Sequence, residues 1–206
     1  MKITTTVLAL FTVLGLAAQL PEALDEVAPF SEDLAAIRKG NDWAFIDDLG
    51  TIVIDFRSDI HWNPSAKETS KGVNAVRQPK FSDGLCMVRT YVDDIAVYGF
   101  INTKGELVIE HQFLNVHPFK NGFTTGVIYE KVFRGRNEFK LDIYEHKFHE
   151  VLMDASGKII EFLGRRYNIQ MKKSRYKLPT VSARLLNDQL VAVKIKNDWA
   201  IKKINL

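Results

Sequence analysis

The sequence lacks most of the features that identify a specialised class of protein. It has a single cysteine, Cys86, among 206 residues, which excludes an intramolecular disulfide framework. Its 28 Lys and Arg residues nearly balance 25 Asp and Glu residues, and a net charge of +3 is too small to indicate nucleic-acid binding by itself. With 46% hydrophobic and 26% charged residues, the composition is that of a folded domain and excludes a disordered or collagen-like chain.

The motifs that mark common enzyme classes are also missing. There is no phosphate-binding Gly-rich loop, no Gly-x-Ser-x-Gly elbow and no zinc-protease helix. We therefore predict no catalytic residue, no cofactor and no metal site. The alternative, an envelope hydrolase or metal-dependent enzyme, depends on His146 and His149, which lie in the only compact group of metal-capable side chains. Because residues three apart point to opposite faces of a strand, this pair would need a turn to act together.

Long hydrophobic runs are limited to the N-terminus. Residues 3–18 carry no charge and follow Lys2. The run is shorter than the ~20 apolar residues of a membrane-spanning helix, and Gly15 and Ala17 supply the small residues of a signal-peptidase site. Residues 1–18 are therefore predicted to be a cleaved signal peptide. This predicts an exported protein, periplasmic or extracellular, with no transmembrane segment after cleavage.

A short motif occurs three times in the chain. It consists of two apolar residues, Asp or Asn, two variable residues, Gly and an apolar run. Asp or Asn begins a type I turn because its side chain bonds the backbone ahead of it, and Gly adopts the left-handed conformation that ends the turn. The flanking residues are β-branched and aromatic, so each copy predicts a β-hairpin with a bulge. The predicted turn residues are Asp47, Gly50, Asn102, Gly105, Asp154 and Gly157.

A second motif precedes each hairpin and places two large apolar residues four positions apart. Its copies begin at Phe30, Phe81, Phe119 and Leu186. Each copy leads into a further strand, so we predict an all-β domain of tandem β-hairpin repeats, stacked as a solenoid, an open propeller-like array or a rolled sheet. Because the first and last copies are the most alike, we also expect the terminal strands to pair and close the array, which would remove two exposed edges.

These motifs resemble the WG-repeat (WG β-repeat) proteins of bacteria. The closest stretch is residues 98–109, and the likeness continues to residues 119–122. It covers about residues 30–206, which we interpret as a single WG-repeat-like β domain preceded by a linker or short helical turn at residues 19–29. Members of this family are mostly of unassigned biochemical role, so the resemblance implies an architecture and carries over no catalytic residue.

The chain departs from the family pattern in two ways. Trp43 and Trp199 are each followed by Ala instead of Gly, and Glu150 takes the corresponding position in the third repeat. Residues near 57–80 and 130–150 read as insertions that lengthen the period of the repeat. The insertions predict a domain whose repeats differ in length.

Charge is distributed unevenly along the chain. Residues 22–59 contain ten acidic and three basic residues, whereas residues 162–187 contain seven basic and no acidic residues. The basic segment predicts a surface for an anionic partner, either a protein or an anionic glycan of the cell envelope, because export argues against nucleic acid. The alternative is an edge strand protected by Lys and Arg. The candidate binding residues are Arg165, Arg166, Lys172, Lys173, Arg175 and Lys177.

Three aromatic residues, Trp43, Tyr98 and Trp199, occupy corresponding positions in their repeats. Aromatic residues at the repeat period usually pack in the core, whereas exposed on one face they would form a stacking platform for sugars. Our leading hypothesis is an exported, non-catalytic β-repeat protein that acts as a binding or scaffolding module in the cell envelope. A carbohydrate-binding module that uses the three aromatic residues is an alternative. Cys86 has small or β-branched counterparts in the other repeats, which predicts a buried structural thiol.

Overall fold

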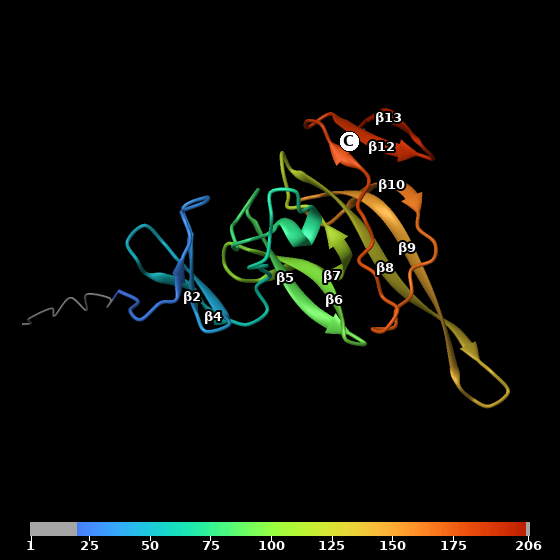
Figure 1. Ribbon diagram of the computed structural model, residues 1–206, viewed down its shortest axis with the longest axis horizontal. Helices are drawn as coiled ribbons and strands as arrows, with labels where there is room; N and C mark the ends of the chain where they lie inside the picture. The colour runs from blue at the N-terminus through green and yellow to red at the C-terminus, as the bar shows by residue number, and fades with distance from the viewer. Residues whose placement is uncertain (1–19, 205–206) are drawn as a thin grey trace, which may run out of the picture.

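The computed structural model describes residues 20–204, and within them the chain is all-β (Figure 1). Three antiparallel sheets follow one another along the chain, and none of them is closed. The prediction of an all-β fold is therefore confirmed. The predicted signal peptide, residues 1–18, lies outside the described residues.

Each sheet is a meander in which every strand pairs with its neighbours in the sequence. The first sheet contains β1 (Glu26–Val27), β2 (Ala35–Lys39), β3 (Asp42–Ile46) and β4 (Ile52–Arg57). The second contains β5 (Leu85–Val92), β6 (Ile95–Asn102), β7 (Leu107–Val116), β8 (Phe123–Arg136), β9 (Asp142–Asp154) and β10 (Ile159–Arg165). The third contains β11 (Arg184–Leu185), β12 (Leu190–Ile195) and β13 (Asp198–Lys203). Within residues 20–204 the only helical element is the 3-10 turn η1 (Gly72–Ala75).

Each of the three Asx–Gly motifs connects two strands of a hairpin. Oδ1 of Asp47 accepts hydrogen bonds from the backbone N–H groups of Leu49 (3.0 Å) and Thr51 (2.7 Å). Asn102 and Asp154 accept the same bonds from the residues two and four positions ahead. The turn ends in a left-handed conformation that costs glycine little, with φ of +79°, +81° and +85° at Gly50, Gly105 and Gly157. These hairpins are therefore specified by residues within the turn itself.

Consecutive repeats are joined by hydrogen bonds between the turns that open them. The opening turns of the first three repeats close with reciprocal backbone hydrogen bonds, as between Ser82 and Leu85. Oγ of Ser31 donates to the carbonyl oxygen of Phe81 (2.8 Å), and Oγ of Ser82 donates to the carbonyl oxygen of Phe119 (2.7 Å). The same bond thus links the first repeat to the second and the second to the third.

Acidic side chains strengthen this series of linked turns. The carboxylate of Glu32 accepts hydrogen bonds from the backbone N–H groups of Asp83 (2.7 Å) and Gly84 (2.8 Å). The carboxylate of Asp83 in turn accepts one from Gly122 (2.8 Å). The third repeat has Asn121 at this position, which carries no carboxylate to continue the series. The linked turns therefore end at the third repeat.

The terminal strands do not pair with each other. β13 pairs only with β12, and β1 pairs only with β2, in sheets that lie at different ends of the molecule (Figure 1). The expectation that the first and last repeats close the array is wrong. Sequence likeness between two edge strands does not bring them together, because the linked turns stop before the fourth repeat.

Two segments lengthen the repeats in different ways. Residues 57–80 form a loop that contains η1, and Ile60 in this loop forms a bridge with Val88, so the loop covers part of the open edge of β5. Residues 130–150 instead lengthen β8 and β9 into a hairpin that projects from the sheet (Figure 1). At the other end of the domain, residues 19–29 contain the short strand β1 and, within their described part, no helical turn.

The first two sheets share a hydrophobic core. Trp43 and Phe45 of the first sheet pack in one buried cluster with Ile60, Phe81 and Cys86. Burial raises the pKa of the Cys86 thiol to about 12, so this side chain stays protonated and serves as a compact core residue. A second cluster lies within the six-stranded sheet and is centred on Phe100, Phe113 and Phe119.

Gly99 of β6 marks a very close approach of two backbones. Phe100 pairs with Ile109, and Tyr98 pairs with Phe113. Between these two pairs β7 contains more residues than β6, so β7 bulges towards Gly99. A Cβ atom at Gly99 would lie 2.5 Å from the carbonyl oxygen of Ile109. We expect Gly99→Ala to lower the free energy of unfolding by about 1–3 kcal/mol, because the backbone must move to admit the methyl group. Urea unfolding measures this loss.

Gly164 of β10 provides the matched control. A Cβ atom there meets no other atom within 4 Å, and the backbone is not left-handed. Gly164→Ala should therefore leave stability unchanged or raise it slightly. A loss of stability at Gly164 equal to that at Gly99 would contradict the steric explanation. In the first repeat Ala44 takes the position of Gly99. The bulge of β4 opposite Ala44, between Ile54 and Arg57, is one residue shorter than the bulge of β7 opposite Gly99, so the methyl group is accommodated.

Candidate functional site

A cavity of about 680 Å³ lies between the six-stranded sheet and the C-terminal sheet. We call it the basic cavity because cations line it together with an indole ring: Lys71, Arg166, Arg184, Lys194, Lys196 and Trp199. The loop before η1 supplies the first of these residues, the segment after β10 supplies the second, and the C-terminal sheet supplies the other four. The site therefore exists only because the C-terminal sheet is held against the end of the third repeat.

Glu150 of β9 holds the chain that leads into the C-terminal sheet. It occupies the position that Trp43 and Tyr98 have in the first two repeats, and its exposed fraction is only 4%. Its carboxylate accepts hydrogen bonds from the backbone N–H groups of Ser182 and Ala183 (2.6 Å each) and from Oγ of Ser182 (2.8 Å). A buried carboxylate that binds the next segment thus replaces the aromatic ring of the earlier repeats.

Arg166 completes this anchor. Its guanidinium lies 3.0 Å from the carboxylate of Glu150 and donates a hydrogen bond to the carbonyl oxygen of Thr180. The charge of Arg166 is therefore already matched inside the protein. His117, which also lines the basic cavity, has its pKa lowered by burial and is neutral at pH 7.

Four other cations at the basic cavity have no carboxylate partner. Within residues 20–204, none of the ion pairs involves Lys71, Arg184, Lys194 or Lys196. Trp199 is 48% exposed, and the guanidinium of Arg184 lies 4.9 Å from the centroid of its ring. The arrangement presents positive charge beside an exposed indole, which is suited to an anionic ligand that carries a ring able to pack on it.

The candidate residues of the basic segment are spread over the surface. Arg165 lies 3.6 Å from Glu145, Lys173 lies 3.5 Å from Asp94, and Arg166 pairs with Glu150, so three of the six have acidic neighbours. Only Arg166 lines the basic cavity. The remaining candidates, Lys172, Arg175 and Lys177, lie in the loop between β10 and β11.

Sequence reasoning missed three of the four unmatched cations, Lys71, Lys194 and Lys196, and did not select the fourth. Lys71 comes from a segment far from Lys194 and Lys196, and none of the three lies in a run of basic residues. Arg184 was counted in the basic segment but was not among the candidate binding residues. A count of charge along the chain contains no signal for cations that only folding brings together.

The three repeat aromatics do not form one exposed face. Trp43 is fully buried and packs edge to face against Trp62, with ring centroids 5.5 Å apart. Tyr98 is also buried, and its ring lies against His61. Only Trp199 is exposed, because the sheet that carries it has no further repeat packed upon it. A stacking platform made of all three rings is therefore not present.

His146 and His149 lie in strand β9, where residues three apart point to opposite faces. The ring of His146 packs between those of Tyr129 and Phe148, with centroids 5.5 and 6.4 Å away. His149 packs edge to face against Phe162 (5.3 Å), and burial lowers its pKa. In the described part of the chain no three His, Cys, Asp or Glu side chains gather as metal ligands would. The two histidines are not brought together.

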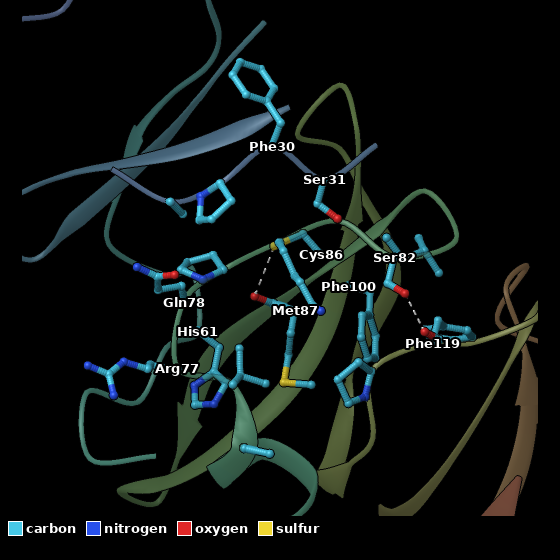
Figure 2. A pocket seen from close by; sticks show the side chains of 18 residues that line it. Phe30, Ser31, His61, Arg77, Gln78, Ser82, Cys86, Met87, Phe100 and Phe119 are labelled. Atoms are coloured by element: carbon cyan, nitrogen blue, oxygen red, sulfur yellow. Dashed lines mark hydrogen bonds between the residues drawn. The ribbon is translucent and has the colours of Figure 1, made fainter. Parts of the chain in front are cut away.

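A second cavity, of about 500 Å³, lies where the first two repeats meet (Figure 2). Nε2 of His61 donates a hydrogen bond to the carbonyl oxygen of Val73 (2.7 Å), and burial lowers the pKa of His61 to about 4. Cys86 stays protonated here, so its thiol and the imidazole of His61 are both neutral at pH 7, although the cations Arg77 and Lys80 also line the cavity. Most of its lining is apolar and includes Phe30, Leu85, Met87, Phe100 and Phe119.

Comparison with known proteins identifies the repeats. Residues 23–43 and 98–125 match the family described as WG containing repeat, which confirms the resemblance seen in the sequence. No curated protein and no solved structure matches the chain. Over residues 20–204, no helix has the length and apolar character needed to cross a membrane.

Proposed function

Because the chain carries WG repeats, we propose that it is an exported, non-catalytic β-repeat protein that binds an anionic glycan of the cell envelope in the basic cavity. Export is inferred from the uncharged run and the small residues of residues 1–18. The repeats supply a rigid support, and the C-terminal sheet completes the binding site.

The observation that carries this proposal is a set of four cations around one open cavity that have no carboxylate partner within residues 20–204. Arginine and lysine side chains bind carboxylate, sulfate and phosphate groups through charge-assisted hydrogen bonds. Trp199 adds an exposed ring on which a sugar can pack its apolar face. A glycan that carries acidic groups on sugar rings matches both features, whereas a neutral glycan would leave the cations unused.

The proposal predicts binding of an acidic polysaccharide that depends on cations of the basic cavity. Calorimetric titration with polygalacturonate should show binding, and titration with neutral dextran should not. The triple variant Arg184→Gln, Lys194→Gln and Lys196→Gln should bind polygalacturonate about tenfold more weakly or worse, since each lost ionic contact is worth roughly 0.5–1 kcal/mol. Binding should also weaken as salt is raised, because exposed charges are screened.

The matched control removes the same charge from the loop between β10 and β11. The triple variant Lys172→Gln, Arg175→Gln and Lys177→Gln should bind the polysaccharide nearly as tightly as the unmodified protein. Equal losses in the two triple variants would refute the assignment to the basic cavity and point to the net charge of the region instead. Absence of binding to polygalacturonate by the unmodified protein would contradict the choice of an acidic glycan.

A further inference from the structure

The hairpin of β8 and β9 extends beyond the rest of the six-stranded sheet as a projecting arm (Figure 1). We call residues 130–145 the arm. Its outer part carries five exposed apolar side chains: Phe133 (54% exposed), Phe139 (82%), Leu141 (63%), Ile143 (47%) and Tyr144 (43%). In residues 20–204 these side chains stay exposed apart from contacts within the arm itself, although exposing them to water is unfavourable.

The apolar side chains lie at the tip and on both faces of the arm. Phe133 is opposite Tyr144 across the strand pair, and their rings meet edge to face at 5.6 Å on one face. Ile143 is next to Tyr144 in β9 and so points to the other face. Phe139 and Leu141 lie in the turn at the tip. A ligand that covers the whole apolar surface must therefore surround the tip from both sides.

Four charged groups of the arm pair within it, whereas the exposed Glu138 and Lys140, which flank Phe139 at the tip, take part in no ion pair among the described residues. Arg134 pairs with Glu145, and Arg136 pairs with Asp142 (2.7 Å). The ammonium of Lys131 lies 4.5 Å from the ring centroid of Tyr144. Pairing lowers the cost of placing the four paired groups in a less polar medium.

We propose that the tip of the arm inserts into the interfacial layer of a lipid bilayer. Lipid can surround a narrow, projecting tip on both faces, whereas a protein groove would have to enclose it. Side chains of Phe and Leu are suited to the boundary between headgroups and acyl chains, and charged residues beside them remain among the headgroups. The ion pairs of the arm lie behind the tip, where they would face the headgroups. This contact would hold the protein at a membrane surface without a spanning segment.

Vesicle sedimentation tests the proposal with lipid that cannot serve the basic cavity. The unmodified protein should sediment with vesicles of pure phosphatidylcholine, and it should still do so at about 0.5 M salt, where the binding of anions by lysine and arginine is strongly screened. The double variant Phe139→Ser and Leu141→Ser should partition into these vesicles at least about tenfold less, because it loses two buried apolar side chains.

The matched control replaces exposed apolar residues on another sheet. Leu49 and Val53 are 78% and 44% exposed in the first sheet, and the variant Leu49→Ser with Val53→Ser should bind vesicles like the unmodified protein. Folding of the tip variant is expected to be retained, because Asn137 holds the turn through the backbone N–H groups of Phe139 and Leu141 (3.0 and 2.9 Å). Circular dichroism verifies this.

Three outcomes would overturn the proposal. The first is no binding of the unmodified protein to phosphatidylcholine vesicles. The second is equal binding by the tip variant and the control. The third is a dimer in solution that the tip variant loses, because that result would assign the apolar tip to a second copy of the chain. Binding of polygalacturonate is not measured in this test. A negative result for the arm therefore leaves the proposal for the basic cavity unaffected, and a negative result for the cavity leaves the proposal for the arm unaffected.

Discussion

Replacing Glu150 by alanine is expected to lower the free energy of unfolding by about 3–5 kcal/mol, towards the lower end because Arg166 is partly exposed. The substitution leaves the guanidinium of Arg166 without its carboxylate. It also leaves the backbone N–H groups of Ser182 and Ala183 without their acceptor. Both losses occur in a largely buried region, where unpaired polar groups are costly. Urea unfolding of the purified variant measures the loss.

The same substitution should also impair the basic cavity. Arg184 follows directly after the segment that Glu150 holds, and it leads into the sheet that carries Lys194, Lys196 and Trp199. Release of this segment should weaken binding of polygalacturonate without removing a single cation. Hydrogen exchange should show faster exchange at Ser182 and Ala183, whose amides lose their acceptor.

Glu110→Ala provides the control for the Glu150 prediction. Glu110 is an exposed glutamate of β7 that takes part in no ion pair within the described residues. Its removal should change stability by less than about 0.5 kcal/mol. If Glu150→Ala were as mild as Glu110→Ala, then Glu150 would not be the anchor of the C-terminal sheet.

Lowering the pH from 6.5 to about 4 is expected to cost the protein about 3 kcal/mol of stability through His61 alone. Burial lowers the pKa of His61 from its ordinary value of 6.5 to about 4, and the hydrogen bond to Val73 opposes this only in part. The unfolded chain binds a proton below pH 6.5, whereas the folded protein binds it only near pH 4. Stability therefore rises with pH across this window and is independent of His61 above it.

The measurement is the free energy of unfolding in urea as a function of pH, for the unmodified protein and for His61→Gln. Other histidines with lowered pKa values, such as His111 and His149, contribute in the same direction in both proteins. The difference between the two curves isolates His61. The unmodified protein should lose about 3 kcal/mol more than His61→Gln between pH 6.5 and 4. Parallel curves would mean that His61 has the same pKa in the folded and unfolded protein, which would contradict the prediction.

The all-β fold could be predicted because its signals are local. The Asx–Gly turns need only five consecutive residues, since the Asx side chain bonds backbone groups two and four positions ahead, as Asp47 bonds Leu49 and Thr51. Recurrence of this turn in three places indicated the repeats before any contact between them was known. The buried position of Cys86 could be predicted in the same way, from its small counterparts in the other repeats.

Pairing between distant strands could not be predicted from likeness. Trp43 and Trp199 occur in nearly identical sequences, yet one is fully buried and the other is 48% exposed. The difference arises because the first repeat is covered by the second, through bonds such as that from Ser31 to Phe81, whereas in residues 20–204 no repeat covers the sheet of Trp199. Exposure is a property of what packs on a residue, so the same local sequence has different surroundings at the two ends.

By itself the sequence determined the repeat, its hairpins and the family to which they are similar, because turn chemistry and alternation act between neighbouring residues. The tertiary structure alone decided that the array stays open, that Glu150 anchors the C-terminal sheet, and that Lys71 shares one cavity with three cations of that sheet. It also decided that residues 130–145 project with an apolar tip. These features depend on which segments lie next to each other in the folded protein. A charged or apolar surface combines side chains from several such segments, so no single stretch of sequence contains it.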